Sequence, residues 1–212
     1  PASVQEMADL TVKGFELADK YRMTSMLLAD GTMGQMMEPV VLDYSSRTDF
    51  DKSWAVTGTK MKRKHNIINS LSLVPDELEE QNFERYKKYA EVEKNETMCE
   101  KYLTDDAEIV TVAFGIAARV AKNAVDEARK MGIKAGLFRP ITLWPFPKNE
   151  LYSLVNTAKR FVSGELSMGQ MIEDIELAVR CERPVSLVNR AGGMIPSPEQ
   201  VLNELVKLNG GK

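Results

Sequence analysis

The stretch Ala107–Gly132, "AEIVTVAFGIAARVAKNAVDEARKMG", contains the pattern of a strand, a turn and a helix. Its first part is a short apolar run rich in β-branched residues, which is typical of a strand buried on both faces. After Gly115, apolar residues recur at helical spacing, and Gly132 is a residue type that commonly follows a helix end. We therefore predict a buried strand and then a helix with the apolar face Ala117, Val120, Ala121, Ala124, Val125, Ala128 and Met131.

The same alternation continues toward the carboxyl terminus. Three more apolar runs are predicted strands, and each is followed by a predicted helix: the strands are "IKAGLFRP" (133–140), "RFVSGELS" (160–167) and "PVSLVNR" (184–190), and the helices begin near Lys148, Met168 and Ser197. Ser163–Gly164 interrupts the second of these runs, which either weakens that strand or lets a neighbour approach closely. Four strands alternating with helices predict an α/β fold, with a three-layer α/β/α domain and a mostly parallel sheet.

The N-terminal part is organised differently. Ser3 and Glu6 have the spacing of a capping box, so a helix is expected from the first residues, and its apolar stripe is Val4, Met7, Ala8, Phe15 and Ala18. "TSMLLAD" (24–30) is an apolar run closed by Asp-Gly and predicts a buried strand. A helix that leads at once into a buried strand belongs in the middle of a sheet domain. We therefore expect that an N-terminal portion of this domain is missing from the sequence.

A segment without periodicity follows, from Leu42 to about Leu73, and it is too long for an ordinary connection. Pro75 then occupies the first position of a long polar helix, "DELEEQNFERYKKYAEVEKNETMCEKYL" (76–103). This helix carries few apolar residues. It is interpreted as a connector that leads into the C-terminal half.

A near-repeat links the two halves, because "MGQMMEPV" (33–40) returns as "MGQMIEDI" (168–175). Thr32 and Ser167 stand just before the two copies, each with a Gln three residues later, which predicts a capping-box variant at two helix starts. Gly34 and Gly169 leave the first turn bare. Two readings stay open: recurrent helix-start chemistry, or two turns at the carboxyl ends of strands, where open α/β sheets bind ligands or partners.

Composition and motifs exclude several functions. A net charge of -3 and a pI near 5.5 argue against a nucleic-acid or anionic-membrane binder. Two separated cysteines and one histidine, His65, fit a reducing cytoplasm and provide neither a disulfide framework nor a transition-metal site. No apolar run is long enough to span a membrane, no signal-like start is visible, and no familiar nucleotide, hydrolase or metalloprotease motif occurs.

Four features are weaker candidates. Gly115 at a strand-to-helix turn and Arg119 beyond it are read as a tight turn and a surface arginine rather than an anion site, because one glycine is weak evidence for a phosphate site. "RPITLWPFP" (139–147) is a stiff apolar segment suited to an interface or to covering the core. Gly192–Gly193 follows the last strand. These residues alone leave two hypotheses open, a subunit of a larger enzyme and a non-catalytic binding module.

Five strings resemble a known family: "ADGTMGQMMEPV", "TDDAEIVTVAFG…AR", "GLFRPITLWPFP", "ELSMGQMIEDI" and "NRAGGMIPSPEQ". Together they resemble the alpha subunit of 2-oxoacid:ferredoxin oxidoreductases, most closely the 2-oxoisovalerate (branched-chain, 3-methyl-2-oxobutanoate) type. The 2-oxoglutarate and pyruvate relatives share much of the pattern. The resemblance covers nearly the whole chain.

The resemblance implies an oxidative decarboxylation that uses thiamine diphosphate and Mg²⁺, passes electrons through iron–sulfur clusters to ferredoxin, and forms acyl-coenzyme A. It implies beta, gamma and ferredoxin-like delta subunits as partners. Residues 1–70 then look like the end of a pyrimidine-binding thiamine domain, 71–104 like a helical connector, and 105–212 like a transketolase C-terminal-like domain. The family's catalytic glutamate lies upstream of Pro1, and the diphosphate, metal and cluster ligands belong to partner subunits.

We therefore expect no catalytic residue in this chain, no metal ligand, no cofactor bound to it alone, and no activity from it alone. We also expect exposed apolar surface on the first helix and on residues 24–30. The candidate subunit-contact turns are Gly34, Gln35, Gly169, Gln170, Gly192 and Gly193.

Overall fold

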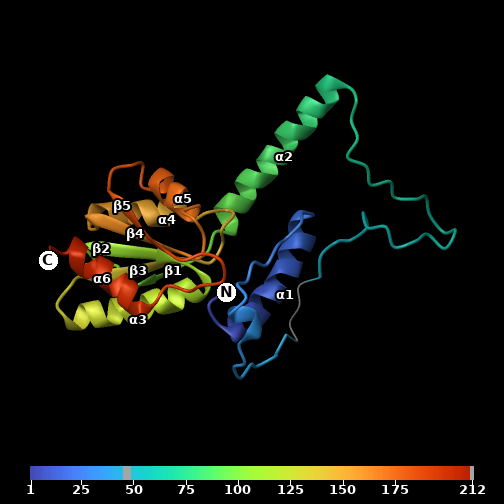
Figure 1. Cartoon of the computed structure of the whole chain (residues 1–212). Helices are drawn as coiled ribbons and strands as arrows, with labels where there is room; N and C mark the ends of the chain where they lie inside the picture. Colours follow the sequence, from blue (N-terminus) through green and yellow to red (C-terminus); the bar gives the residue numbers. More distant parts are fainter. Residues whose placement is uncertain (45–48, 211–212) are drawn as a thin grey trace.

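The computed structural model describes residues 1–44 and 49–210 (Figure 1). In chain order its elements are α1 (Val4–Tyr21), the 3₁₀ turn η1 (Met33–Gln35), α2 (Pro75–Asn95), β1 (Cys99–Tyr102), β2 (Ile109–Ala113), α3 (Gly115–Lys130), β3 (Ala135–Pro140), α4 (Lys148–Tyr152), η2 (Ser153–Asn156), β4 (Arg160–Glu165), α5 (Met171–Ala178), β5 (Val185–Asn189) and α6 (Pro198–Leu208).

A single sheet of five strands, in the order β1-β3-β2-β4-β5, organises the C-terminal half. The strands β2, β3, β4 and β5 run parallel, and β1 pairs antiparallel with β3. Every residue of β2 is buried, as its apolar β-branched sequence predicted for a central strand. Ser163–Gly164 does not break β4. Because Gly164 has no side chain, β4 packs closely against β2: a Cβ at Gly164 would lie 3.2 Å from the Cβ of Ala113. The predicted close approach is therefore confirmed.

Helices cover both faces of the sheet, and the predicted three layers are confirmed. On one face, α3 and α6 enclose a core built from the alanines and valine of α3 together with Val201 and Leu205. On the other face, α4, η2 and α5 pack on Phe138 and Phe161. α6 starts at the predicted place, with a capping box of Ser197 and Gln200. Met131 does not belong to the apolar face of α3, because the helix ends at Lys130 and 59% of Met131 is exposed.

The N-terminal part lies beside the carboxyl edge of this sheet (Figure 1). Ser3 caps α1 by accepting from the Glu6 amide, as predicted, but the Glu6 carboxylate accepts from the Ala2 amide rather than from Ser3. The Glu6 carboxylate also accepts a hydrogen bond from each terminal nitrogen of the Arg139 guanidinium, both at 2.9 Å. This paired geometry is the strong form of an arginine–carboxylate contact, so it fixes α1 to β3.

A second contact holds the far end of α1. Glu96, 7% exposed, accepts from Lys20 at 2.6 Å and from the Tyr21 hydroxyl at 2.7 Å, and Lys13 lies 3.6 Å away. Burial opposes ionisation of Glu96, but these partners outweigh it and lower its pKa.

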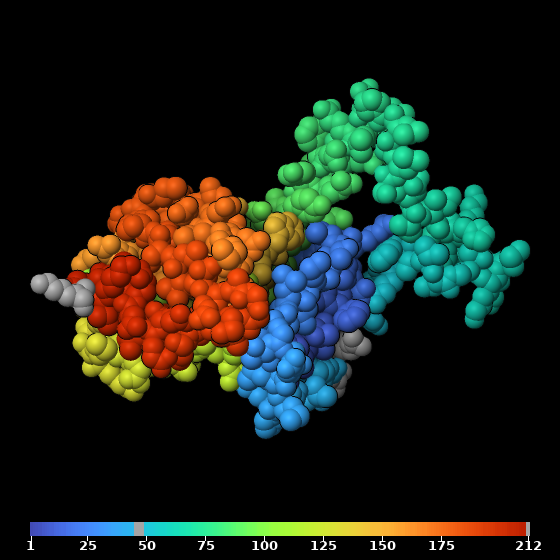
Figure 2. All heavy atoms as spheres, viewed as in Figure 1, coloured from blue at the N-terminus to red at the C-terminus, as the bar shows by residue number. Residues whose placement is uncertain are grey.

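Residues 49–74, called the arm below, project away from the sheet and return to the start of α2 (Figures 1 and 2).

Two sequence predictions of secondary structure are wrong. Residues 24–30 are extended but form no strand, because no described segment pairs with them, and Met26 and Leu28 are more than half exposed. The connector helix does not continue to residue 103. It ends at Asn95, and Cys99–Tyr102 form β1, which makes five strands instead of four. The pattern missed β1 because an edge strand of four residues with two charges has no apolar signature.

The exposed apolar surface expected on α1 and residues 24–30 is present, and it includes Phe15.

Candidate functional site

The carboxyl edge of the sheet has a topological switch point between β2 and β4. The chain leaves β2 toward β3 on one side, and the next strand, β4, pairs with β2 on the other side. Connections from the two strands therefore diverge there, and α/β sheets bind ligands at such crevices. A pocket of about 400 Å³ opens at this point, between Phe114–Gly115 after β2 and Glu165–Ser167 at the end of β4.

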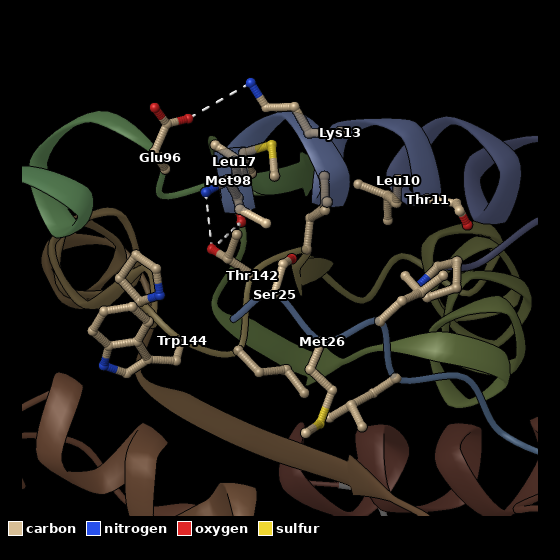
Figure 3. A pocket seen from close by; sticks show the side chains of 18 of the residues that line it. Leu10, Thr11, Lys13, Leu17, Ser25, Met26, Glu96, Met98, Thr142 and Trp144 are labelled. Carbon is tan, nitrogen blue, oxygen red and sulfur yellow. Dashed lines mark hydrogen bonds and ion pairs between the residues drawn. The ribbon is translucent and has the colours of Figure 1, made fainter. Parts of the chain in front are cut away.

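A larger pocket, of about 560 Å³, adjoins the first, and both include Leu28, Phe114, Gly115 and Leu143. Figure 3 shows this larger pocket, with Leu10 and Leu17 of α1 on one side and Met26 of the extended segment on another. The stiff segment Arg139–Pro145 forms a further wall that includes Trp144. The lining of this pocket is mostly apolar, so the pocket suits the side chains of a partner better than a charged ligand.

Asp30 closes the N-terminus of α3 at the switch point. One carboxylate oxygen accepts from the Ile116 amide at 3.0 Å, and the other accepts from the Met33 amide at 2.8 Å. Gly115 is required here, because its φ is +60° and a Cβ would come within 2.8 Å of the Asp30 oxygen. The predicted tight turn at Gly115 is confirmed. The first copy of the repeat is thereby attached to the sheet domain.

Glu165 does the same for α5. It is 2% exposed and accepts five hydrogen bonds, from the Ser163 and Ser167 hydroxyls and from three amides at the start of the helix, those of Gln170, Met171 and Ile172. Burial opposes ionisation, but the hydrogen bonds outweigh it and lower the pKa of Glu165. Nearby Asp174 lines the same pocket, and burial together with Glu173 and Glu165 raises its pKa.

The capping prediction for the repeat is therefore wrong in both copies. Thr32 makes no side-chain cap bond, and Ser167 donates to Glu165 instead of capping a helix that begins at Met171. Carboxylates take the capping role because a charged acceptor binds an amide more strongly than a hydroxyl does. Sequence reasoning missed Asp30 and Glu165, although each lies at the end of an apolar run and just before a helical turn.

The six candidate turn residues lie in three separate turns. Gly34 and Gln35 are exposed in η1, and Gln170 is exposed at the start of α5. Gly169 has φ +98°, and Gly192 and Gly193, which follow β5, have φ +68° and +89° in an exposed turn. Arg119, read as a surface residue, is 40% exposed, and it also donates to Glu38 at 2.7 Å and to the Ala2 carbonyl, so it helps to hold the N-terminal segment.

The residues at the switch point do not fit a diphosphate or a metal cluster. Both helix N-termini that face it are occupied by carboxylates of this chain, and Asp174 adds a third acid, so an anionic group would be repelled. Cys99 lies on β1 at one edge of the sheet and Cys181 just before β5 at the other edge, and an iron–sulfur cluster takes four thiolates. In the described ranges 1–44 and 49–210, no group of three or more potential ligands is placed to hold a metal ion. No helix among these residues is long and apolar enough to cross a membrane.

Comparisons with known proteins agree with this architecture. Residues 107–201 match the model of the pyruvate:ferredoxin oxidoreductase core domain II. The solved 2-oxoglutarate:ferredoxin oxidoreductase from Magnetococcus marinus, determined with 2-oxoglutarate, coenzyme A and succinyl-CoA bound, superposes with a TM-score of 0.73 at 18% identity, over 98% of this chain and 41% of that chain. This likeness shows the fold and confirms the predicted fold class.

Residues 107–201 are thus similar to core domain II of pyruvate:ferredoxin oxidoreductases. The whole chain is homologous to ketoisovalerate oxidoreductase subunits: it is 49% identical to subunit VorB of Methanothermobacter thermautotrophicus over 211 residues, 99% of this chain and 59% of that relative. The 2-oxoglutarate synthase subunit KorA of the same organism is 26% identical over 243 residues, 99% of this chain and 62% of that relative. The chain therefore spans about three fifths of the length of these relatives.

Proposed function

We propose that this chain is part of the alpha subunit of a thiamine-diphosphate-dependent 2-oxoacid:ferredoxin oxidoreductase that acts on 2-oxoisovalerate. The assembled enzyme would decarboxylate the 2-oxoacid oxidatively, form acyl-coenzyme A and pass electrons through iron–sulfur clusters to ferredoxin. The observation that carries this proposal is the identity of 49% to a ketoisovalerate oxidoreductase subunit, against 26% to a 2-oxoglutarate synthase subunit of the same organism.

In this proposal the chain assembles and positions other parts of the enzyme. Residues 1–70 complete a pyrimidine-binding thiamine domain, residues 71–104 connect, and residues 105–212 form the transketolase C-terminal-like domain. The acidic switch point supports this division of labour, because Asp30, Glu165 and Asp174 disfavour diphosphate there, and the thiamine diphosphate, Mg²⁺ and cluster ligands then come from other segments or from beta, gamma and delta subunits. The turns at Gly34–Gln35, Gly169–Gln170 and Gly192–Gly193 are proposed subunit contacts.

The enzyme is proposed to work in the cytoplasm, where the thiols of Cys99 and Cys181 stay reduced. A non-catalytic docking module is the second candidate, and it is favoured by the mostly apolar pocket between α1 and Arg139–Pro145. The two candidates differ in whether a complex that contains this subunit turns over a 2-oxoacid.

The test is co-expression of the longer subunit that contains this chain with its cluster-bearing partners, followed by an assay of 2-oxoacid- and coenzyme-A-dependent reduction of a viologen dye. We expect turnover, with kcat/KM for 2-oxoisovalerate at least about tenfold above those for pyruvate and 2-oxoglutarate. The 212-residue chain alone should be inactive. Turnover by the chain alone would overturn its non-catalytic role, a preference for 2-oxoglutarate or pyruvate would overturn the substrate, and an inactive, fully loaded complex would favour the docking module.

A further inference from the structure

The arm, residues 49–74, presents apolar side chains to solvent. Six of them are more than half exposed: Val56, Met61, Ile67, Ile68, Leu71 and Leu73. Figure 2 shows the arm standing clear of the sheet domain. So much apolar surface on a projecting segment is typical of a surface that contacts another chain.

The far part of the arm is nevertheless locally organised. The Asn66 side-chain amide donates to the Ser53 and Ala55 carbonyls, at 2.6 and 3.0 Å, and brings the two sides of the arm together. The Arg63 guanidinium donates to the carbonyls of Gly58 and Lys64. These bonds shape a loop in which Lys60, Lys62 and Lys64 are exposed.

The arm and the start of α2 carry opposite charges. The arm has four cations within five residues, Lys60, Lys62, Arg63 and Lys64, and the first two turns of α2 have four acids, Asp76, Glu77, Glu79 and Glu80. Among the described residues, no ion pair joins these two groups within the chain. The ion pairs present are Lys13 and Lys20 with Glu96, Lys52–Asp19, Lys87–Glu84, Arg119–Glu38, Arg129–Asp106, Lys130–Glu127, Lys134 and Lys159 with Glu108, Arg139 with Glu6 and Glu100, Lys148–Glu93 and Lys207–Glu204.

The acids of α2 are accompanied by exposed apolar residues. Leu78, Phe83 and Tyr86 lie on the same outer half of the helix and are exposed. Acids in the first helical turn are favourable simply because of the helix dipole, and this accounts for Asp76 and Glu77. Glu79 and Glu80 lie beyond that turn, so the dipole does not account for them.

We propose that the arm of one copy docks on the outer half of α2 of a second copy, with its lysines against Glu79 and Glu80 and its apolar residues against Phe83 and Tyr86. Since one chain carries both surfaces, a two-fold axis makes the contact twice and closes the dimer. The arm and residues 75–86 of α2 hold 38 residues per copy, which is enough to supply the roughly 20–30 residues a side of stable interfaces. This inference goes beyond the proposed function and does not rest on it.

Sedimentation velocity and light scattering of the purified 212-residue chain test the dimer. We expect a dimer whose dissociation constant rises when NaCl is increased from about 50 to about 500 mM, because exposed charge pairs are screened. A chain that stays monomeric at all concentrations overturns the proposal and assigns the arm to a different protein.

Charge reversal tests the pairing itself. Lys62→Glu with Lys64→Glu, and separately Glu79→Lys with Glu80→Lys, should each raise the dissociation constant at least about tenfold. The four changes together should restore it to within about threefold, because opposite charges again face each other. The matched control for the lysine reversal is Lys130→Glu with Lys207→Glu, which changes the net charge equally on α3 and α6, where the two lysine side chains are 70% and 71% exposed.

The variants keep the proposal falsifiable in another respect. The reversed residues are exposed, so circular dichroism should show that all variants fold. A dimer that is unaffected by either reversal, or that is lost equally in the control, would contradict docking through the arm. Loss in both reversals without recovery in the combined variant would contradict the stated pairing.

Discussion

In the first copy of the repeat, Met33 is 1% exposed, the turn η1 is three residues long, and the chain continues without a helix. In the second copy the equivalent Met168 is 80% exposed, and the eight-residue helix α5 begins at Met171. The two identical MGQM tetrapeptides therefore bury opposite ends, the first Met in one copy and the last Met in the other. The difference comes from their neighbours: Pro39 disfavours helical backbone at Glu38 in the first copy, whereas the second follows a strand that holds Glu165 beneath the helix start.

The comparison teaches that the placement of one carboxylate decides what the repeat becomes. Asp30 accepts from one amide of its own turn and one amide of α3, so it joins two segments that are 86 residues apart. Glu165 accepts from three successive amides of a single helix and so starts that helix. The first copy is therefore a tertiary contact, and the second is a helix start.

The largest effect is expected from Glu165→Ala. The change leaves a buried hydroxyl and three amides without their charged acceptor, and it should lower the free energy of unfolding by about 3 kcal/mol. Urea unfolding followed by far-UV circular dichroism measures this, with the exposed Glu176→Ala on the same helix as the control. Equal stability of the two variants would show that Glu165 does not start α5.

The pH dependence gives a second reading of the same residue. The folded pKa of Glu165 is lowered, so its contribution is complete above the usual value of 4.5 and is lost as the pH falls through the folded pKa. The stability difference between the wild type and Glu165→Gln should therefore shrink as the pH falls below the usual value of 4.5. A difference that grows on acidification would contradict the assigned direction.

Asp30→Ala should have the next largest effect, about 1–2 kcal/mol, since a capping carboxylate is lost. The expected consequence is local: amide hydrogen exchange should speed up at Met33 and Ile116 while the β2 amides stay protected. Asp30→Asn retains one acceptor and should fall between Asp30→Ala and the wild type. Faster exchange throughout the sheet would mean that the first copy supports the whole domain instead.

The two repeat glycines provide a matched pair. Gly169→Ala places a side chain at φ +98° with a Cβ 3.2 Å from Leu187, and it should cost about 1–2 kcal/mol. Gly34→Ala meets nothing within 4 Å at ordinary backbone angles and should change stability by less than about 0.5 kcal/mol. Thermal unfolding of both variants measures the difference. Equal costs would mean that the two turns are more alike than their backbones indicate.

The sequence was sufficient for the sheet and its layers, because β2, β3 and β4 are apolar runs and α3 has a clear helical period. It was insufficient for Thr24–Asp30, whose strand-like composition finds no pairing partner among the described segments, and for β1, whose charged sequence forms a strand only because β3 offers an edge. The prediction of helix caps at the switch point was wrong for a related reason. Hydroxyl-to-glutamine spacing is a local signal, whereas Asp30 reaches Ile116 through tertiary structure.

The smallest effect concerns the two hydroxyls that the pattern nominated as caps. Ser167→Ala removes a 2.6 Å bond to Glu165 and should cost about 1 kcal/mol, because one donor to a buried carboxylate is lost. Thr32→Ala removes no side-chain cap bond and should stay within about 0.5 kcal/mol of the wild type. Urea unfolding of the two single variants and the double variant measures both. If Ser167→Ala is as neutral as Thr32→Ala, the remaining four donors are enough to hold Glu165 in place, and the two copies differ through the carboxylates alone.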